Sequence, residues 1–446
     1  MALDDPAGWE PTAAPDRANV RTVRALVFDP APQRLPLAGM ATRIRPRWGL
    51  GGASLLALRE IPEPAAPAPD WVRARVLRCG ICGSDVKEVL LQAASDNPLS
   101  GLVSFPHVPG HEIVARVEEP GIASALEAGQ LVVVDPWVGC RARGLPTLCP
   151  ACQRGFPPHC WCVPDGGPWG SGRGMHLGNI RGLPGGFAEV IVAHPSQCHP
   201  LPPDLTAELG VLADPLAVAL HALERSGPEP MGPIVVLGAG TIGLALTLAA
   251  RLRWPGLPVW VTAAWPHQLE LIRGLGAEPL PVAAREVVPE LASRTGGRLV
   301  RPWRGGPWVL GAGAGLVMDS IGSSSTMELA LRCLGPRGRI VVVGVARPQR
   351  TETTLAYYKE AEIIGSNGYG RSELVEGRPH LLALALGILA EHADQLGRWC
   401  THSLPVSRYR EAFRLAADPG REGSIKVSLQ LEDGRGDPGR PAQPAA

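Results

Sequence analysis

The sequence predicts an α/β protein with two domains, one β-rich and one built on a doubly wound parallel sheet. Its 446 residues exceed what a single hydrophobic core usually holds. Through the second half of the chain, short apolar runs alternate with segments of helical periodicity, the pattern of parallel strands joined by helices. In the first half, strand-like runs are separated by stretches rich in glycine and proline.

Composition and charge indicate an ordinary globular protein. The 43 basic and 42 acidic residues leave a net charge of +1, so no long-range field attracts nucleic acid or anionic lipid. No apolar run reaches the roughly 18 residues of a membrane span, and residues 1–19 lack the apolar core of a signal peptide. We therefore expect a cytoplasmic protein, in which ten cysteines favour metal ligation over disulfides.

The first domain is expected over residues 21–207. Its strand-like runs are, in order, 24–29, 71–77, 107–117, 131–134 and 186–192. Residues 30–53 show little pattern and are expected to form an inserted loop. Residues 1–20 and 431–446 are rich in Pro, Gly, Ala and charged residues without periodicity, so we expect both tails to be disordered.

The parallel-sheet domain is expected over residues 208–365, entered through helices over 205–224. Its strands are predicted at 234–237, 259–262, 315–319 and 339–343, and its helices at 242–253 and 325–334. From 366 to 430 the alternation ends. This last part contains amphipathic helices at 381–393 and 406–416 and a strand at 425–429.

A glycine-rich loop in the second domain predicts dinucleotide binding. The GxGxxG pattern spans Gly238, Gly240, Thr241, Ile242 and Gly243, between a predicted strand and a predicted helix. The first glycine permits a tight turn, the second lets the backbone approach a pyrophosphate, and the third lets the helix pack closely on the strand. The alternative is a glycine-rich turn in some other doubly wound sheet.

The residue expected to bind the adenosine ribose is absent. About 20 residues after the loop, where an acidic side chain would accept hydrogen bonds from the ribose hydroxyls, the chain has Ala263. Loss of the carboxylate also removes its repulsion of a 2′-phosphate, so NADP becomes an alternative to NAD. No Arg immediately follows to pair that phosphate, and His267 and Arg273 are candidates for it.

A second group of residues suggests a zinc site. Cys82, Ser84 and Asp85 lie within four residues, and His111 and Glu112 follow further on. Zinc takes sulfur, nitrogen and oxygen ligands, and a catalytic zinc keeps one position open. The alternative is a pair of free cysteines in a turn and a histidine bonded in the core.

These motifs together resemble a known family. CGICGSD at 79–85, GHE at 110–112, a four-cysteine lobe at 140–162 and GAGTIG at 238–243 occur in the order found in the zinc-dependent medium-chain alcohol and polyol dehydrogenases. The resemblance covers roughly residues 23–430. It implies a GroES-like catalytic domain, a Rossmann domain and a return of the chain to the first domain after residue 365. It also implies a homodimer or a homotetramer.

The resemblance assigns roles around the first zinc. It implies that Cys82, and not Cys79, ligates the ion together with His111, while Asp85 accepts the free ring N–H of His111. The alternative for Asp85 is capping of the following helix. Ser84 would take the alcohol proton, and Lys87 stands where many relatives have a histidine relay.

Two carboxylates remain open as further ligands. In polyol-type relatives the residue matching Glu112 ligates zinc, and in others it stands behind the ion. Asp214 stands in the segment matching the family's Glu-Pro-Leu and is either a ligand, direct or through water, or a helix N-cap. Lys426 stands where the family places a basic residue near the cofactor phosphates; the alternative is a surface lysine.

The cysteine lobe is expected to hold a structural zinc. Cys149, Cys152 and Cys160 match three family ligands, and we infer that Cys140 is the fourth, separated by a six-residue insertion. Cys162 is a spare candidate.

The sequence therefore favours hydride transfer between NAD or NADP and an alcohol or its ketone, with one catalytic and one structural zinc. The acidic pair Glu112 and Asp214 resembles sorbitol dehydrogenases, which favours a secondary or polyol-like substrate. The alternatives are a threonine-dehydrogenase-like oxidation of a 3-hydroxy amino acid, and a non-catalytic nucleotide-binding protein on the same fold.

Overall fold

A computed structural model describes residues 21–44, 49–51, 54–92, 97–122, 124–166, 170–345 and 350–431. The expected tails lie outside these residues, with the exception of Leu431. That residue is not part of a tail, because it is buried and donates its backbone N–H to the Leu77 carbonyl. Within the described ranges, every helix is too short or too polar to traverse a bilayer.

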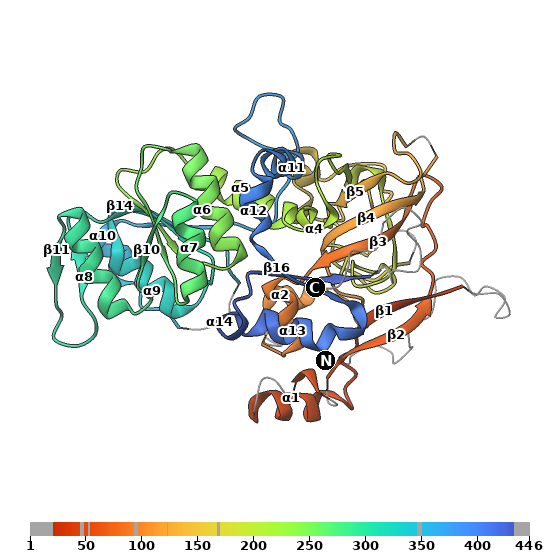
Figure 1. Ribbon diagram of the computed structural model, residues 1–446, viewed down its shortest axis with the longest axis horizontal. Coiled ribbons are helices and arrows are strands. Elements are labelled where there is room, and N and C mark those ends of the chain that lie inside the picture. Colours follow the sequence, from red (N-terminus) through yellow and green to blue (C-terminus); the bar gives the residue numbers. More distant parts are fainter. Residues whose placement is uncertain are drawn as a thin grey trace, which may run out of the picture.

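The chain folds into two lobes that lie side by side (Figure 1). One lobe holds the early strands and the last two strands of the chain, and the other holds the middle of the chain from β8 to β15. The C-terminal segments, drawn in blue, run back from the second lobe into the first. This is the predicted α/β architecture of a β-rich domain and a doubly wound parallel sheet.

The first lobe is built on a seven-stranded sheet in the order β16-β17-β3-β4-β5-β7, with β6 pairing with β3. Its strands are β3 (Val72–Gly80), β4 (Glu112–Glu119), β5 (Leu131–Val134), β6 (Val190–Ala193), β7 (Cys198–Pro200), β16 (Cys400–Pro405) and β17 (Lys426–Gln430). The antiparallel register of β3 and β4 places Gly80 opposite Glu112. The sheet thus brings the CGICGSD segment beside the GHE segment.

An N-terminal hairpin joins this lobe. β1 (Thr22–Phe28) pairs along its whole length with β2 (Leu56–Pro62), a strand that the sequence did not indicate. The expectation of a loop over 30–53 is wrong in part, because α1 (Leu35–Ile44) lies inside it. Pro36 falls in the first turn of α1, where its missing N–H costs no hydrogen bond, so the proline that suggested a loop is compatible with a helix start.

The second lobe is a six-stranded parallel sheet in the order β10-β9-β8-β13-β14-β15. Its strands are β8 (Ile234–Leu237), β9 (Val259–Thr262), β10 (Glu278–Leu280), β13 (Ala314–Asp319), β14 (Leu334–Val342) and β15 (Glu362–Gly365). Its helices are α6 (Thr241–Arg253), α7 (Pro266–Gly274), α8 (Ala284–Thr295), α9 (Ser324–Cys333) and α10 (Thr354–Lys359), and a hairpin is formed by β11 (Arg298–Val300) and β12 (Trp308–Leu310). The strand order reverses at β8, so the glycine loop after β8 lies at the switch point where such sheets bind ligands.

Helices connect the two lobes. The helices predicted over 205–224 are α4 (Ala207–Gly210) and α5 (Ala213–Arg225), and α11 (Leu381–Glu391) packs against α5. The remaining helices are α2 (Gly83–Val89), α3 (Pro150–Gln153), α12 (Ala393–Gly397), α13 (Tyr409–Ala417) and α14 (Pro419–Glu422). One apolar cluster fills the first lobe, and a second joins β8 and α6 to α5 and α11.

Candidate active site

Glycines at the end of β3 and just before β4 make room for the side chains of the candidate site. A Cβ added to Gly80 would lie 1.9 Å from a carboxylate oxygen of Glu112, so only glycine leaves room for that side chain. Gly110 has a φ of +94°, a value that favours glycine, and β4 begins only at Glu112. On a regular strand, the side chains of His111 and Glu112 would point to opposite faces and could not both reach one ion. Because His111 lies outside the strand, both side chains can point to the same side.

Three ligand atoms converge at this point. One donor atom each of Cys82, His111 and Glu112 lies within 4.8 Å of the other two. Cys79 is fully buried on β3 and is outside this group. The donor set of one sulfur, one imidazole nitrogen and one carboxylate oxygen fits a zinc ion with a coordination position left open.

Asp85 fills both roles considered for it. One of its carboxylate oxygens accepts a hydrogen bond from the backbone N–H of Cys82 at 2.9 Å, at the start of α2, and the other lies 3.5 Å from Nδ1 of His111. Burial disfavours the charged ring, but Asp85 and Cys82 beside it raise the pKa of His111 well above its usual value. Asp85 thus lies where it can fix the orientation of the His111 ring.

Lys426 is not the surface lysine of the alternative prediction. It is buried, and its ammonium lies 2.7 Å and 2.6 Å from the two carboxylate oxygens of Glu112. Despite the cost of burial, Glu112 raises the pKa of Lys426, so the ammonium stays charged at neutral pH. The ammonium of Lys426 therefore forms an ion pair with Glu112 at the metal-ligand cluster. Lys426 also lines the cleft that contains the glycine loop.

Asp214 lies in the first turn of α5, whose N-cap is Leu212, so the N-cap alternative is wrong. Its carboxylate accepts a hydrogen bond from the buried Tyr369 hydroxyl at 2.6 Å, and it is outside the group of three converging donors. Burial raises the pKa of Asp214 to about 7. Of the two acidic residues left open by the sequence, Glu112 is the one placed with Cys82 and His111.

Ser84 and Lys87 lie on α2 near the cluster. Ser84 is exposed in the first turn of the helix, directly after the cleft-lining residue Gly83. Lys87 donates a hydrogen bond to the Val345 carbonyl in the loop after β14, so it bridges the two lobes. Burial lowers the pKa of Lys87.

Two aromatic side chains, His176 and Trp137, pack beside His111. The ring centroid of His176 lies 5.2 Å from that of His111 and 5.2 Å from that of Trp137. Nδ1 of His176 lies 2.6 Å from the Leu177 carbonyl and so donates to it, which leaves Nε2 as an acceptor. Burial, with a contribution from His111, lowers the pKa of His176 to about 3, so the ring is neutral.

The glycine loop has the geometry that the motif predicts. Gly238 has a φ of +95°, and its N–H donates to the Thr262 hydroxyl at 2.8 Å. A Cβ on Gly243 would lie 1.9 Å from the Gly238 carbonyl oxygen, whereas a Cβ on Gly240 would meet nothing within 4 Å. Gly243 therefore permits close helix–strand packing, and Gly240 borders open space that a pyrophosphate can occupy.

One cleft contains both the loop and the metal-ligand cluster. A cavity of about 370 Å³ is lined by residues of the glycine loop and by Cys82, Glu112 and Lys426. The Thr241 hydroxyl donates to the Ile425 carbonyl at 2.9 Å, which ties the start of α6 to the segment before β17. The predicted cofactor loop and two of the predicted zinc ligands, Cys82 and Glu112, thus line the same space.

The end of β9 shows what replaces the missing acidic residue. Ala263 follows the strand, and the side-chain oxygen of Gln268 accepts hydrogen bonds from the backbone N–H groups of Ala264 and Trp265. No arginine lines the cleft among the described residues. This corner therefore carries no charged side chain at the expected ribose-binding position.

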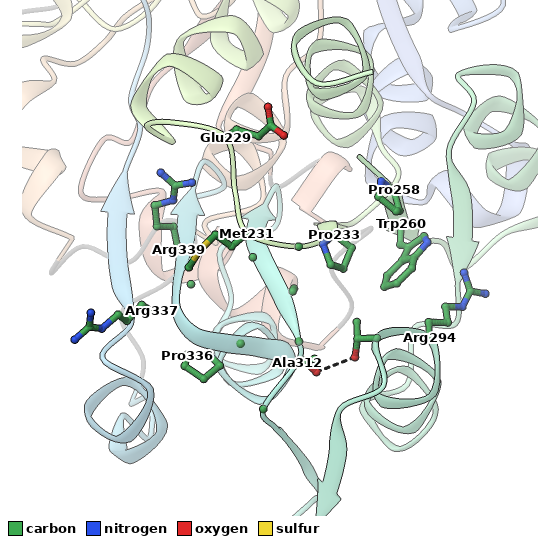
Figure 2. Close-up of a pocket in the computed structure, with 18 of the residues that line it drawn as sticks. Glu229, Met231, Pro233, Pro258, Trp260, Arg294, Ala312, Pro336, Arg337 and Arg339 are labelled. Carbon is green, nitrogen blue, oxygen red and sulfur yellow. Dashed lines mark hydrogen bonds between the residues drawn. The ribbon is translucent and has the colours of Figure 1, made fainter. Parts of the chain in front are cut away.

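A larger cavity, of about 630 Å³, lies at the opposite edge of the parallel sheet (Figure 2). Figure 2 shows Arg337 and Arg339 on one side and Arg294 on the other. Arg294 pairs with Glu278, Arg337 with Glu360, and Arg339 donates to the Pro228 carbonyl. Because open α/β sheets bind ligands at the carboxyl ends of their strands, this cavity is not the cofactor site.

The cysteine lobe brings together the four predicted thiols. The sulfur atoms of Cys140, Cys149, Cys152 and Cys160 all lie within 4.8 Å of one another, whereas Cys162 is outside the group. The sulfurs of Cys140 and Cys160 are 3.6 Å apart, close to the roughly 3.8 Å expected for a tetrahedral zinc with bonds of about 2.3 Å. Backbone N–H groups donate to the sulfurs of Cys140, Cys149 and Cys152. These contacts suit thiolates that hold a metal.

Fold and site together define a two-domain dehydrogenase. The alcohol dehydrogenase GroES-like domain matches residues 68–203, and the zinc-binding dehydrogenase domain matches residues 241–382. The chain belongs to the zinc-dependent medium-chain alcohol and polyol dehydrogenase family.

Individual relatives agree with this family. An uncharacterised zinc-type alcohol dehydrogenase-like protein of Haemophilus influenzae is 31% identical over 70% of this chain and 80% of its own. Sorbitol dehydrogenase of Bombyx mori is 27% identical over 85% of this chain and 97% of its own. A zinc-binding dehydrogenase structure from Sinorhizobium meliloti, bound to NADP, has a TM-score of 0.64 and 21% identity over 92% of this chain and 99% of its own.

Proposed function

We propose that the protein is a zinc- and NAD(P)-dependent dehydrogenase that oxidises a secondary, polyol-like alcohol and reduces the matching ketone. The observation that carries the proposal is the shared cleft, in which Cys82 and Glu112, grouped with His111 as metal ligands, line the same cavity as the glycine loop. A zinc ion held by these residues would act as a Lewis acid that lowers the pKa of a bound hydroxyl. A nicotinamide cofactor held by the glycine loop would supply the acceptor or donor of the hydride.

The chain's own residues orient the ligands and move the proton. Asp85 fixes the His111 ring, and Lys426 holds the Glu112 carboxylate, so that the donor atoms are positioned before substrate binds. Ser84 accepts the alcohol proton and passes it to solvent. Position 87, where many relatives have a histidine relay, is a lysine that donates to the Val345 carbonyl. The proton therefore leaves through water.

NADP is the favoured nicotinamide cofactor. Ala263 supplies no carboxylate to repel a 2′-phosphate.

A polyol-like substrate is supported by the paired carboxylates and by the relatives. Glu112 and Asp214 are both buried at the site, and the sorbitol dehydrogenase relative spans almost the whole chain. We further propose a structural zinc on Cys140, Cys149, Cys152 and Cys160 and a homodimer or homotetramer, as the family resemblance implies. From the composition of the sequence we also propose a cytoplasmic location.

Absorbance at 340 nm with a substrate panel tests the function. We expect reduction of NADP, and more slowly of NAD, with sugar alcohols and vicinal diols, and little reduction with ethanol. Turnover should stop after chelation and return with added zinc. Turnover with threonine alone would favour the 3-hydroxy amino acid alternative. Cofactor binding without turnover on any alcohol would favour a non-catalytic protein.

A further inference from the structure

A third group of metal-ligating side chains lies outside the two predicted zinc sites. One donor atom each of Asp135, His199 and His380 lies within 4.8 Å of the other two. Asp135 follows β5, His199 is the middle residue of β7, and His380 is the N-cap of α11. Three segments far apart in the sequence thus converge, without any local motif.

The donor atoms in this group do not satisfy one another. Nε2 of His199 is buried and has no hydrogen-bond partner. Nε2 of His380 lies 3.3 Å from a carboxylate oxygen of Asp135, longer than a normal charge-assisted hydrogen bond of about 2.7–2.9 Å. Two donors bound to one zinc at about 2.0–2.1 Å in tetrahedral geometry lie about 3.3 Å apart. The distance between His380 Nε2 and the Asp135 carboxylate oxygen therefore fits two ligands of one ion better than a direct hydrogen bond between them.

The geometry points to a third zinc site, with Asp135, His199 and His380 as protein ligands and water in the fourth position. Two imidazoles and one carboxylate are a donor set that zinc accepts.

Neighbouring residues hold the site in place. The other oxygen of Asp135 accepts the backbone N–H of Trp137 at 3.1 Å. The side-chain amide of Gln197 donates to the Asp135 and Trp137 carbonyls, and the backbone N–H of Asp135 donates to the Gln197 carbonyl at 2.7 Å. The end of β5 is therefore fixed beside β7 before any metal binds, as an oriented ligand requires.

Metal binding competes with one existing contact. Nδ1 of His380 accepts the Leu382 N–H at 3.3 Å, whereas ligation through Nε2 moves the ring proton to Nδ1 and breaks this cap. A structural zinc stabilises a folded domain far more than a single helix N-cap does, so the ion outweighs the cap.

The site would connect the β-rich sheet to the helical packing behind the active site. The ring of Tyr369 lies edge-on to His380 with centroids 5.9 Å apart, and its hydroxyl donates to Asp214. α11, which His380 caps, packs against α5, the helix that carries Asp214. The bound ion would hold α11 and Tyr369 in register with the first domain.

Metal analysis of the full-length protein tests the site. After saturation with zinc chloride and dialysis, we expect three zinc ions per chain by mass spectrometry. The variants His199→Gln and Asp135→Asn should each lose one ion and keep the other two. His402→Gln is the matched control, because His402 also has a buried, unpartnered ring nitrogen but belongs to no donor group among the described residues.

Separate variants distinguish this site from the catalytic one. Cys82→Ala should remove a different ion, so that Cys82→Ala/His199→Gln retains only one. Circular dichroism checks that each variant is folded, and Asp135→Asn keeps the shape of the side chain should His199→Gln unfold. Equal zinc contents in wild type, His199→Gln and Asp135→Asn would overturn the proposal, whatever Cys82→Ala shows.

Discussion

Two glycines of the cofactor loop should respond in opposite ways to the same added methyl group. A Cβ on Gly240 meets no protein atom within 4 Å, whereas a Cβ on Gly243 would lie 1.9 Å from the Gly238 carbonyl oxygen. Gly240 has a φ of −79° and a ψ of −173°, values that alanine adopts without strain. Gly240→Ala should therefore fold normally, and Gly243→Ala should not pack.

The magnitudes follow from where each methyl group goes. At Gly240, alanine is a poorer N-cap, which lowers stability by about 0.5–1 kcal/mol. Alanine also lowers the entropy of the unfolded chain, which raises stability by about 0.5–1 kcal/mol. The two effects nearly cancel, so stability should hardly change. The methyl group instead occupies space that a pyrophosphate would use, and overpacking of about 1–3 kcal/mol would weaken dinucleotide binding about 5- to 150-fold. At Gly243 the clash forces α6 away from β8 and should cost about 1–3 kcal/mol of stability or more.

Fluorescence titration with NADPH and urea unfolding separate these effects. We expect Gly240→Ala to unfold at the wild-type urea concentration but to bind NADPH at least about fivefold more weakly. We expect Gly243→Ala to unfold at a lower urea concentration. Wild-type NADPH affinity in a folded Gly240→Ala protein would refute the placement of the pyrophosphate at this loop.

Further predictions concern the ion pair, the cofactor, the cysteine lobe and one buried histidine. Lys426→Met leaves the Glu112 carboxylate buried and unpaired, so the free energy of unfolding at pH 7 should fall by about 3–5 kcal/mol, and Glu112→Gln in the same chain should restore part of it. Ala263→Asp should weaken NADPH binding at least about tenfold relative to NADH, because a like charge faces the 2′-phosphate; an unchanged ratio of the two dissociation constants would argue against a ribose site at this corner. Cys149→Ser should remove one zinc ion and lower the melting temperature in calorimetry, and retention of the full zinc content would contradict the four-cysteine site. Burial lowers the pKa of His221 to about 4, below its unfolded value of about 6.5, so acidification from pH 6.5 toward 4 protonates only the unfolded state and lowers stability by up to about 1.4 kcal/mol per pH unit. His221→Phe should flatten this part of the stability curve, measured by urea unfolding at pH 7 and pH 5.

Local patterns predicted the fold and the positions of the two zinc-ligand groups. Strands 234–237 and 259–262 have the predicted bounds, because a buried parallel strand is a continuous apolar run with clear ends. Cys82 and His111 were recognisable because their flanking glycines and acidic residues are close in sequence. The Cys140 thiol needed an assumed insertion, and the structure places it with its three partners.

Contacts between distant segments were not predictable in the same way. Lys426 and Glu112 are 314 residues apart, and neither carries a local signal that they form a buried pair. Tyr369 stands 155 residues from Asp214, and no local signal indicated that its hydroxyl donates a hydrogen bond to that carboxylate. The cluster of Asp135, His199 and His380 arises only from the sheet register and the position of α11. Long-range side-chain pairing depends on the assembled fold, which periodicity and spacing do not encode.

The most direct test of the catalytic assignment is to measure zinc content and polyol-oxidation rate on the same preparations of wild type and Cys82→Ala. Lewis-acid activation is worth several kcal/mol, and each 1.4 kcal/mol is about tenfold in rate. We predict that Cys82→Ala loses one zinc ion and at least about 1,000-fold in rate, while NADPH affinity stays at the wild-type value. A Cys82→Ala protein that keeps both its zinc content and its rate would contradict the assignment.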